Sequence, residues 1–239
     1  LGAGEGMTGS SLILVSNDGS RTMNTHLGMC QELEPDDIDE KVLSSTNILY
    51  LTGFLWDTES QKASVRHALE MAENLPVKVA LSLSDPFCVE RHHQDFNELI
   101  RSRVDLLFCN QEEAFTMMET QVTQEALAGL SENVETVVMT LGNRGSLICN
   151  QGQIYYIDPI EVEVVDTTGA GDAYAAGFLY GFSHDQSIMN CGRIASVTAG
   201  TVIEQIGPRI ETASMKTLKE RLTNIPVSYT HLTLPTKSS

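Results

Sequence analysis

Short apolar runs alternate with amphipathic segments along most of the chain. An apolar run that stops at Gly, Ser or Asn predicts a buried strand, and apolar residues spaced three and four apart predict a helix. The predicted strands are Asn47–Gly53, Val77–Leu83, Val104–Cys109 and Glu135–Thr140, and the predicted helices are Ser60–Leu75, Val89–Arg101, Glu112–Met118, Asp172–Phe182, Ile188–Ile203 and Ser214–Leu222. This alternation predicts a three-layer α/β/α fold with a mostly parallel central sheet.

Two segments depart from the alternation. Ser146–Tyr156 is hairpin-like, and the strands Ser11–Ser16 and Arg21–Thr25 flank an Asn17-Asp18-Gly19 turn. We expect residues 1–30 to form part of a small β lid and residues 31–226 to form the α/β domain. Residues 227–239 lack helical periodicity and carry one charged side chain, Lys237, so we expect a non-native tail there.

Four loops follow predicted strands or precede a predicted helix. Ligands of parallel sheets bind outside the carboxyl ends of the strands, so we expect the functional site at these loops. They are Ser82–Phe87, Asn110–Glu113, Thr140–Gly145 and Asp166–Asp172.

The composition argues against some classes of binding partner. The chain has 239 residues with 15 Lys and Arg against 32 Asp and Glu, a formal net charge of −17, which would repel a nucleic acid. A phosphorylated ligand would instead need backbone amides, helix ends and metal ions. No apolar run approaches the ~20 residues of a membrane span, so we expect no membrane partner. The five scattered cysteines are typical of reduced, mostly buried thiols in a cytoplasmic protein.

The segment Asp166-Thr167-Thr168-Gly169-Ala170-Gly171-Asp172 carries the strongest chemical signal. Its glycines let the backbone approach a ligand, and the amides of Gly169, Ala170 and Gly171 would open the next helix as an anion hole. Asp172 in the first turn would stay ionised and could accept a hydroxyl proton. Asp166 is suited to binding a cation or to fixing the loop. The alternative is a plain glycine turn that caps the helix.

The segment DTTGAGDAYAAGFLYG resembles the C-terminal signature of the ribokinase-like (PfkB) family of carbohydrate and nucleoside kinases. Two further segments resemble family motifs: Asn110-Gln111-Glu112-Glu113 is like NxxE, and Thr140–Gly145 is like TxGxxG. Alone, the first would be read as a helix cap and the second as an ordinary turn. The likeness covers most of residues 8–222. It implies a kinase that uses ATP and Mg²⁺.

The resemblance also implies roles for individual residues. Asn110 and Glu113 would organise Mg²⁺ near the phosphates, and Asp166 and Thr168 resemble positions that hold a monovalent cation such as K⁺ in part of the family. The nucleotide side would comprise Asn110, Thr140, Gly142, Gly145, Thr168 and Gly207. Family members begin with a strand and a glycine-rich segment that nothing before Gly9 matches. We therefore expect the natural protein to begin before Leu1.

Within the family, the sequence most resembles adenosine kinases and their bacterial relatives. This resemblance implies a role in purine salvage. By that resemblance Phe87 would stack on a purine, Met23 and Thr25 would provide lid contacts, and Arg21 would face the phosphates. Phe87 could instead be a core residue, and Arg21 a solvated strand residue. The implied reaction transfers the γ-phosphoryl group of ATP to a primary hydroxyl, the 5′-OH of adenosine.

Two alternative functions stay open, and a third lacks its motif. A sugar kinase acting on ribose, fructose or a keto-sugar acid, and an inactive fragment that binds nucleotide, both fit the motifs. A dinucleotide-dependent oxidoreductase would need a GxGxxG after the first strand, which is absent. We expect a monomer or a homodimer. His92 and His93 are predicted to be solvated, and Cys109 to be a small buried hydrophobic residue rather than a nucleophile.

Overall fold

The computed structural model describes residues 6–16, 21–212 and 214–223. Contacts divide the chain into two compact units, which are described separately. The first unit comprises residues 1–13 and 23–134, and the second comprises residues 14–22 and 135–239, each as far as its residues are described. The predicted lid boundary at residue 30 stays a prediction, and the predicted tail at 227–239 and the turn at 17–19 lie outside the described residues.

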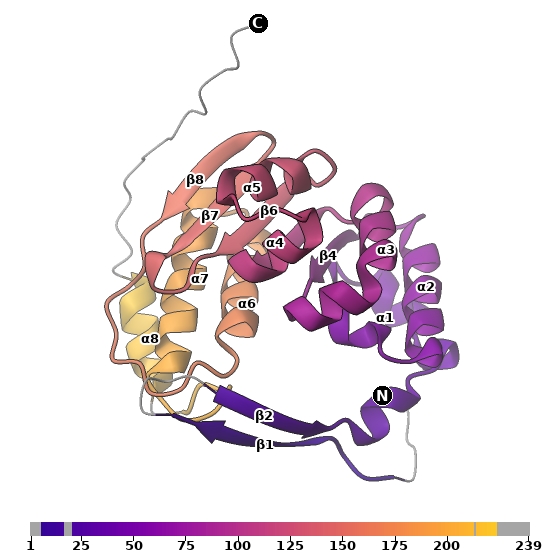
Figure 1. Cartoon of the computed structure of the whole chain (residues 1–239), viewed down its shortest axis with the longest axis horizontal. Coiled ribbons are helices and arrows are strands. Elements are labelled where there is room, and N and C mark those ends of the chain that lie inside the picture. The colour runs from indigo at the N-terminus through magenta and orange to yellow at the C-terminus, as the bar shows by residue number, and fades with distance from the viewer. Residues whose placement is uncertain (1–5, 17–20, 213, 224–239) are drawn as a thin grey trace, which may run out of the picture. The chain divides into compact units, whose positions relative to one another are not determined.

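The first unit contains three parallel strands with crossover helices (Figure 1). The strands are β3 (Ile48–Thr52), β4 (Lys78–Ser82) and β5 (Leu106–Asn110), and the helices are η1 (Gly28–Glu32), η2 (Pro35–Asp37), α1 (Glu40–Ser44), η3 (Gly53–Trp56), α2 (Glu59–Ala72), α3 (Pro86–Ser102), α4 (Gln111–Met118) and α5 (Thr123–Ser131). Thr52 pairs with Ser82, and Ser82 with Phe108, so β3 and β4 end level with each other and β5 continues two residues further, to Asn110. The loops that follow therefore start from one edge of this part of the sheet.

Burial on both faces explains why these strands are continuous apolar runs. Ala80, Leu81, Leu106 and Leu107 are almost completely buried, although they alternate between the two faces. The ring of Phe96 in α3 meets Trp56 edge-on with ring centroids 5.3 Å apart, which packs α3 against the end of η3. The core therefore fixes where each strand-end loop begins.

The described part of the second unit combines three antiparallel strands with one short 3-10 helix and three α-helices. The strands are β6 (Thr136–Thr140), β7 (Ser146–Asn150) and β8 (Gln153–Ile157), and the helices are η4 (Gly142–Arg144), α6 (Ala170–Ser183), α7 (Ile188–Ile203) and α8 (Ser214–Thr223). Small residues bring α6 and α7 close, because a Cβ on Gly177 would lie 2.8 Å from the Cα of Ala195. Helix α6, which follows the glycine-rich segment, is thus held firmly by its neighbour.

The strands β3 to β8 follow one another in chain order in a six-stranded sheet. The alternation of helices and strands confirms the predicted α/β class, and the antiparallel β6–β7–β8 meander contains the predicted hairpin at Ser146–Tyr156. A separate two-stranded sheet pairs β1 (Ser10–Val15) with β2 (Arg21–His26), as expected for the lid strands. The Ser11 and Thr25 hydroxyl oxygens lie 2.8 Å apart across this ribbon.

Three sequence predictions need correction. Helix α3 begins at Pro86 rather than Val89, because Asp85 caps it through a 2.8 Å bond from Cys88 N. Helix α6 begins at Ala170, two residues before the predicted start at Asp172. Helix α5 was not predicted, since Val122 lacks a side-chain cap and the helix is short.

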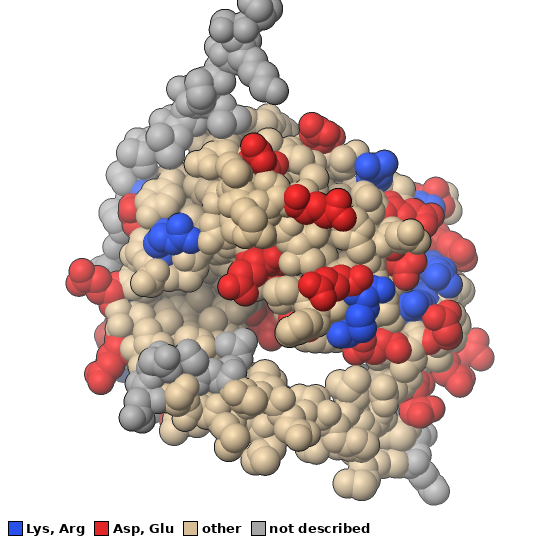
Figure 2. Space-filling view, viewed as in Figure 1, with Lys and Arg blue, Asp and Glu red and all other residues tan. Residues whose placement is uncertain are grey.

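Acidic side chains are spread over the face shown in Figure 2, with fewer Lys and Arg between them. This distribution agrees with the charge argument against a polyanionic partner. In the part of the chain that the structure describes, no helix combines the length and apolar character that crossing a bilayer requires.

Candidate active site

Helix α6 begins at a glycine in the left-handed conformation. Gly169 is the N-cap residue, with φ 78°, and no described side chain caps the helix. A Cβ on Gly169 would lie 2.6 Å from Pro208 Cβ, so only glycine fits this turn. At Gly171, by contrast, a Cβ would have no described atom within 4 Å. The space beside the first turn is open, and the positive end of the helix favours an anion there.

Asp172 lies in that first turn and is exposed. A carboxylate near a helix N-terminus is stabilised in its ionised form by the helix dipole. The sequence prediction that Asp172 falls in the first helical turn is therefore confirmed. The arrangement places a carboxylate beside the backbone amides of a helix start.

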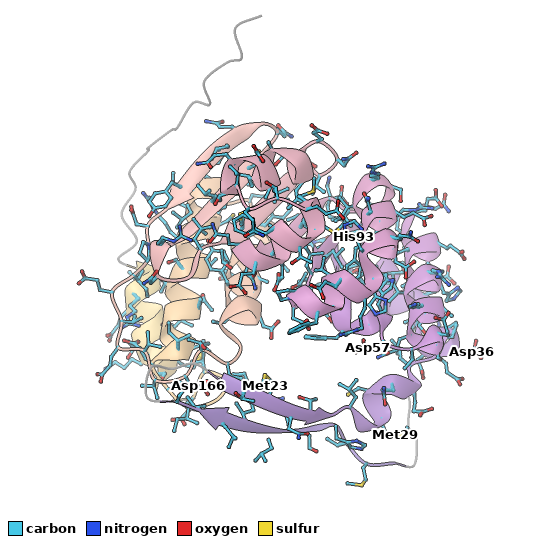
Figure 3. The ribbon with its side chains drawn as sticks, viewed as in Figure 1. Met23, Met29, Asp36, Asp57, His93 and Asp166 are labelled. Atoms are coloured by element: carbon cyan, nitrogen blue, oxygen red, sulfur yellow. The ribbon has the colours of Figure 1, made fainter. Side chains whose placement is uncertain are left out.

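Asp166 ties the loop before α6 to a distant segment (Figure 3). Its Oδ1 accepts hydrogen bonds from Thr168 N at 2.8 Å and from Thr168 Oγ1 at 2.6 Å, and its Oδ2 accepts one from Gly207 N at 2.9 Å. Asp166 and Thr168 are 2% and 5% exposed. Of the two roles predicted for Asp166, these contacts are those of a residue that fixes the loop. The role in holding a cation stays a prediction.

The Thr140–Gly145 segment forms a tight turn at the end of β6. Leu141 N donates to Gly145 O at 2.8 Å, and Gly142 and Gly145 have φ of 62° and 80°. The hydroxyl oxygens of Ser146 and Tyr174 lie 2.5 Å apart, and both residues are buried. This contact joins the turn to α6 two residues after Asp172. Sequence analysis missed it, because Tyr174 falls at an apolar position of the helix and looks like an ordinary core residue.

In the first unit, Asn110 and Glu113 cap α4 reciprocally. Glu113 N donates to Asn110 Oδ1 at 2.8 Å, and Asn110 N donates to Glu113 Oε2 at 2.9 Å. Asn110 Nδ2 donates to Glu113 Oε1 at 2.6 Å. The pattern is a capping box, so the helix-cap interpretation of the NxxE segment is correct as far as local structure goes. Capping does not prevent the same carboxylate from binding a cation.

Glu113 is 5% exposed, and its burial raises the pKa of the carboxyl from 4.5 to about 7. The Asn110 backbone bond opposes this shift, while Asp85 and Glu112 add to it. Mg²⁺ in nucleotide sites is commonly bound through one or two carboxylates together with substrate phosphates. Each Glu113 oxygen retains a lone pair beyond its bond to Asn110, so this residue fits such an ion. In the described chain, His, Cys, Asp and Glu side chains form no cluster of three that could hold a metal without substrate.

The predicted acceptor residues are solvent-accessible. Phe87, in the first turn of α3, is 71% exposed, so the alternative that it is a core residue is wrong. Met23 on β2 is 48% exposed (Figure 3), and Thr25 contacts Ser11. Arg21 begins β2, but its side chain lies outside the described residues.

Residues 3–214 match the pfkB family of carbohydrate kinases. The chain belongs to this family. It is 39% identical to adenosine kinase from Sinorhizobium meliloti, whose crystal structure superimposes with a TM-score of 0.86 over 89% of this chain and 66% of that one. An uncharacterized sugar kinase from Archaeoglobus fulgidus is 27% identical over 205 residues, 86% of this chain and 80% of that protein. Ribokinase from Thermotoga maritima, at 21% identity over 91% of this chain and 70% of that one, shares the fold with a TM-score of 0.68.

These likenesses confirm the predicted family and the ribokinase-like fold. The chain spans 66% of the length of the adenosine kinase structure. PfkB-family kinases are phosphotransferases.

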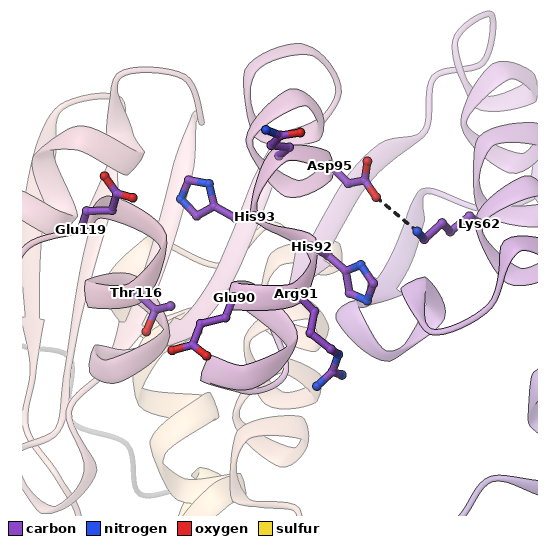
Figure 4. A pocket seen from close by; sticks show the side chains of 9 residues that line it. Lys62, Glu90, Arg91, His92, His93, Asp95, Thr116 and Glu119 are labelled. Atoms are coloured by element: carbon purple, nitrogen blue, oxygen red, sulfur yellow. Dashed lines mark ion pairs between the residues drawn. The ribbon is translucent and has the colours of Figure 1, made fainter.

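The first unit also holds a polar cavity of about 570 Å³ around the middle of α3 (Figure 4). His93 points toward α4, where its Nε2 lies 3.0 Å from Met117 O. The side chain of His92 is 13% exposed and lies on the other side, with Nε2 3.8 Å from Asp57 Oδ1. The prediction of solvated histidines is therefore wrong for His92, whose side chain is largely buried, whereas His93 is half-buried beside the cavity. The backbone of α3 is non-helical at His92, with φ −121° and ψ 24°.

Cys109, next to Asn110, is buried, and burial raises its pKa well above 9.0. This agrees with the prediction of a small buried hydrophobic residue rather than a nucleophile. Four of the five cysteines are buried and Cys30 is exposed, and all five are free thiols.

Proposed function

We propose that this chain, with whatever precedes or follows it in the natural protein, is an ATP-dependent kinase that phosphorylates a primary hydroxyl of a nucleoside, the 5′-OH of adenosine. The observation that carries the proposal is the uncapped start of α6, with Asp172 in its first turn. Family membership supports the reaction class, and the 39% identity to an adenosine kinase supports the acceptor.

In the proposed mechanism, Asp172 accepts the proton of the acceptor hydroxyl as its oxygen attacks the γ-phosphorus. The amides of Gly169 and Gly171 stabilise the negative charge on the transferring group. The Ala170 amide, also predicted from the sequence to take part, already donates to Thr167 O at 3.2 Å, so it is not a free donor in this structure. The bond between the γ-phosphorus and the β–γ bridging oxygen breaks, and ADP leaves. Bound Mg²⁺ would neutralise phosphate charge, and Glu113 with Asn110 would hold it. Thr140, Gly142, Gly145, Thr168 and Gly207 would support the nucleotide.

Phe87 is the residue proposed to give the enzyme its specificity for a purine nucleoside. An exposed aromatic ring offers a flat face for stacking on a base, and a sugar gains little from it. Phe87→Ala should raise the KM for adenosine about 10-fold and leave the KM for ATP unchanged. Phe87→Tyr, which keeps the aromatic face, is the matched control. An unchanged KM for adenosine in Phe87→Ala would remove Phe87 from the acceptor site.

The second candidate is a sugar kinase, favoured by the 27% identity to a sugar kinase over 80% of that protein. Assays of phosphoryl transfer to adenosine, ribose and fructose, with ATP and Mg²⁺, separate the two. Turnover of adenosine alone supports the first proposal, and turnover of a sugar alone rejects it. A chain that binds ATP but phosphorylates none of these acceptors would be an inactive nucleotide-binding form.

The proposal also covers the cellular location and a monovalent cation. The buried thiols suit the reducing environment of the cytoplasm, where free cysteines persist. A requirement for K⁺ through Asp166 and Thr168 can be measured by replacing K⁺ with tetramethylammonium in the assay. A rate that is the same in both salts would remove the monovalent cation from the mechanism.

A further inference from the structure

The loops that follow β3 and β4 are joined by one hydrogen bond. Thr52 and Ser82, the last residues of these strands, are partners in the parallel register. One residue beyond Thr52, Gly53 N donates to Ser84 Oγ at 2.8 Å. Ser84 Oγ in turn lies 3.3 Å from Ser82 O, to which it donates. The Ser84 hydroxyl therefore bridges the two strand-end loops inside the first unit.

Ser84 has a backbone conformation that serine rarely adopts. Its φ is +74°, in the left-handed region that normally favours glycine or asparagine. Such a conformation persists only where the surroundings hold it, and it marks positions where local geometry serves a purpose. Hydrogen bonds of the two neighbouring residues hold the backbone around Ser84: Leu83 N donates to Phe108 O at 3.1 Å, and Asp85 N donates to Leu83 O at 3.0 Å.

Gly53, the other partner, has no room for a side chain. A Cβ there would lie 2.7 Å from Leu83 O and 3.1 Å from Cys88 Sγ. Gly53 is also buried, so water cannot readily replace the Ser84 hydroxyl as the acceptor for its N–H. Gly53 therefore leaves no space for a side chain, and its hydrogen bond to Ser84 is partly buried.

Exposed aromatic residues follow the bridge on both loops. Phe54, directly after Gly53, is 46% exposed, and Phe87, three residues after Ser84, is 71% exposed. Asp85 lies between Ser84 and Phe87 and caps α3, so the bridge sets where that helix starts and where its first turn presents Phe87.

We propose that Ser84 is a positioning residue for acceptor binding: its hydroxyl fixes the two loops that carry Phe54 and Phe87. The inference rests on the proposed function, because it needs Phe87 to contact the acceptor. Ser84 itself touches neither substrate nor reacting atoms in this scheme. Nothing in the hydrophobic pattern singles this serine out, and only its φ and its bond to Gly53 do so.

The test measures steady-state kinetics of Ser84→Ala and Ser84→Gly against the wild-type chain. Both variants lack the hydroxyl, so the KM for adenosine should rise about 3- to 10-fold, the effect of losing one partly buried hydrogen bond. The KM for ATP and kcat should stay within about twofold, because only ground-state positioning of the acceptor is lost. Ser102→Ala is the matched control, since Ser102 sits at the far end of α3 and donates only to Glu98 O.

The glycine variant separates the hydroxyl from the backbone strain. Glycine accepts φ +74° without cost but cannot bond to Gly53 N. A wild-type KM for adenosine in Ser84→Gly would overturn the proposal, as would a lowered melting temperature in both variants with an unchanged KM for adenosine.

A second measurement does not depend on turnover. Amide hydrogen exchange of the peptide covering residues 50–56 should be faster in Ser84→Ala than in wild type, and unchanged exchange would overturn the bridge. If the wild-type chain transfers no phosphoryl group, the proposed function fails and the comparison moves to adenosine affinity by calorimetry. Weaker binding by both Ser84 variants would then support the positioning role, and equal binding, or no binding by the wild type, would reject it.

Discussion

Two helices of this protein begin in opposite ways. Helix α4 in the first unit is closed by its own side chains, since Asn110 and Glu113 bond to each other's backbone amides. Helix α6 in the second unit begins at Gly169 with no described side-chain cap, and the space beside Gly171 is open. Both starts belong to segments that resemble kinase motifs, yet side chains cap only the start of α4.

The two helix starts are suited to different ligands, one to a cation and the other to an anion. A capped helix start is locally complete, so its buried carboxylate is available to act on a cation but its capped amides are not available to an anion. An uncapped start is incomplete until an anion arrives, and the glycines keep that place open. The supports differ as well: Asp166 holds the α6 loop from outside the helix, whereas Glu113 holds α4 from within it.

The largest effect is expected at the open helix start. Asp172→Asn should lower kcat by about 10³-fold, because the amide cannot accept the hydroxyl proton. Nucleotide affinity, measured by calorimetry with ATP and Mg²⁺, should change less than about threefold. Asp158→Asn, a neutralised exposed carboxylate elsewhere in the second unit, is the control. Normal turnover in Asp172→Asn would refute the assignment of the base.

Two glycine variants should sharpen the comparison next. Gly171→Ala should be folded and more stable by about 0.5 kcal/mol, since alanine favours the helix, but its methyl would occupy the open space and weaken ATP binding about 10-fold. Gly169→Ala should lose about 2 kcal/mol of unfolding free energy from its positive φ and the contact with Pro208. The checks are chemical denaturation and ATP titration. Unchanged ATP affinity in folded Gly171→Ala would mean that the phosphates bind elsewhere.

Sequence could predict the features that depend on local pattern. The span of α7 was predicted as Ile188–Ile203 and found at those residues, and the glycine-rich start of α6 was placed within two residues. Contacts between distant segments could not be predicted in this way. The bond from Gly207 N to Asp166 links residues 41 positions apart, and the bond from Gly53 N to Ser84 spans 31 positions. Each depends on where strands end in space, which periodicity does not record.

The capped helix start should reveal itself through pH. Burial raises the pKa of Glu113 from 4.5 to about 7, so between these values the folded chain binds a proton that the unfolded chain has lost. The wild type should therefore lose stability as pH rises through this window. Without metal, it should lose about 2 kcal/mol more unfolding free energy than Glu113→Gln between pH 4.5 and 7.5. Glu98→Gln, which changes an exposed residue of α3, is the control and should lose as much unfolding free energy as the wild type. If the unfolding free energies of Glu113→Gln and the wild type changed equally with pH, the carboxyl of Glu113 would not be protonated in the folded chain.

The smallest effect concerns the thiol beside the capped helix start. Cys109 precedes Asn110, is 5% exposed, and has its pKa raised by burial, so little thiolate forms at pH 8. Cys30 is exposed, and iodoacetamide should modify it at least about 10 times faster than Cys109 in the folded chain. Mass spectrometry of tryptic peptides measures both rates, and denaturation in urea should make them equal. Equal rates in the folded chain would show that the start of α4 opens to solvent, and the contrast with the start of α6 would then be lost.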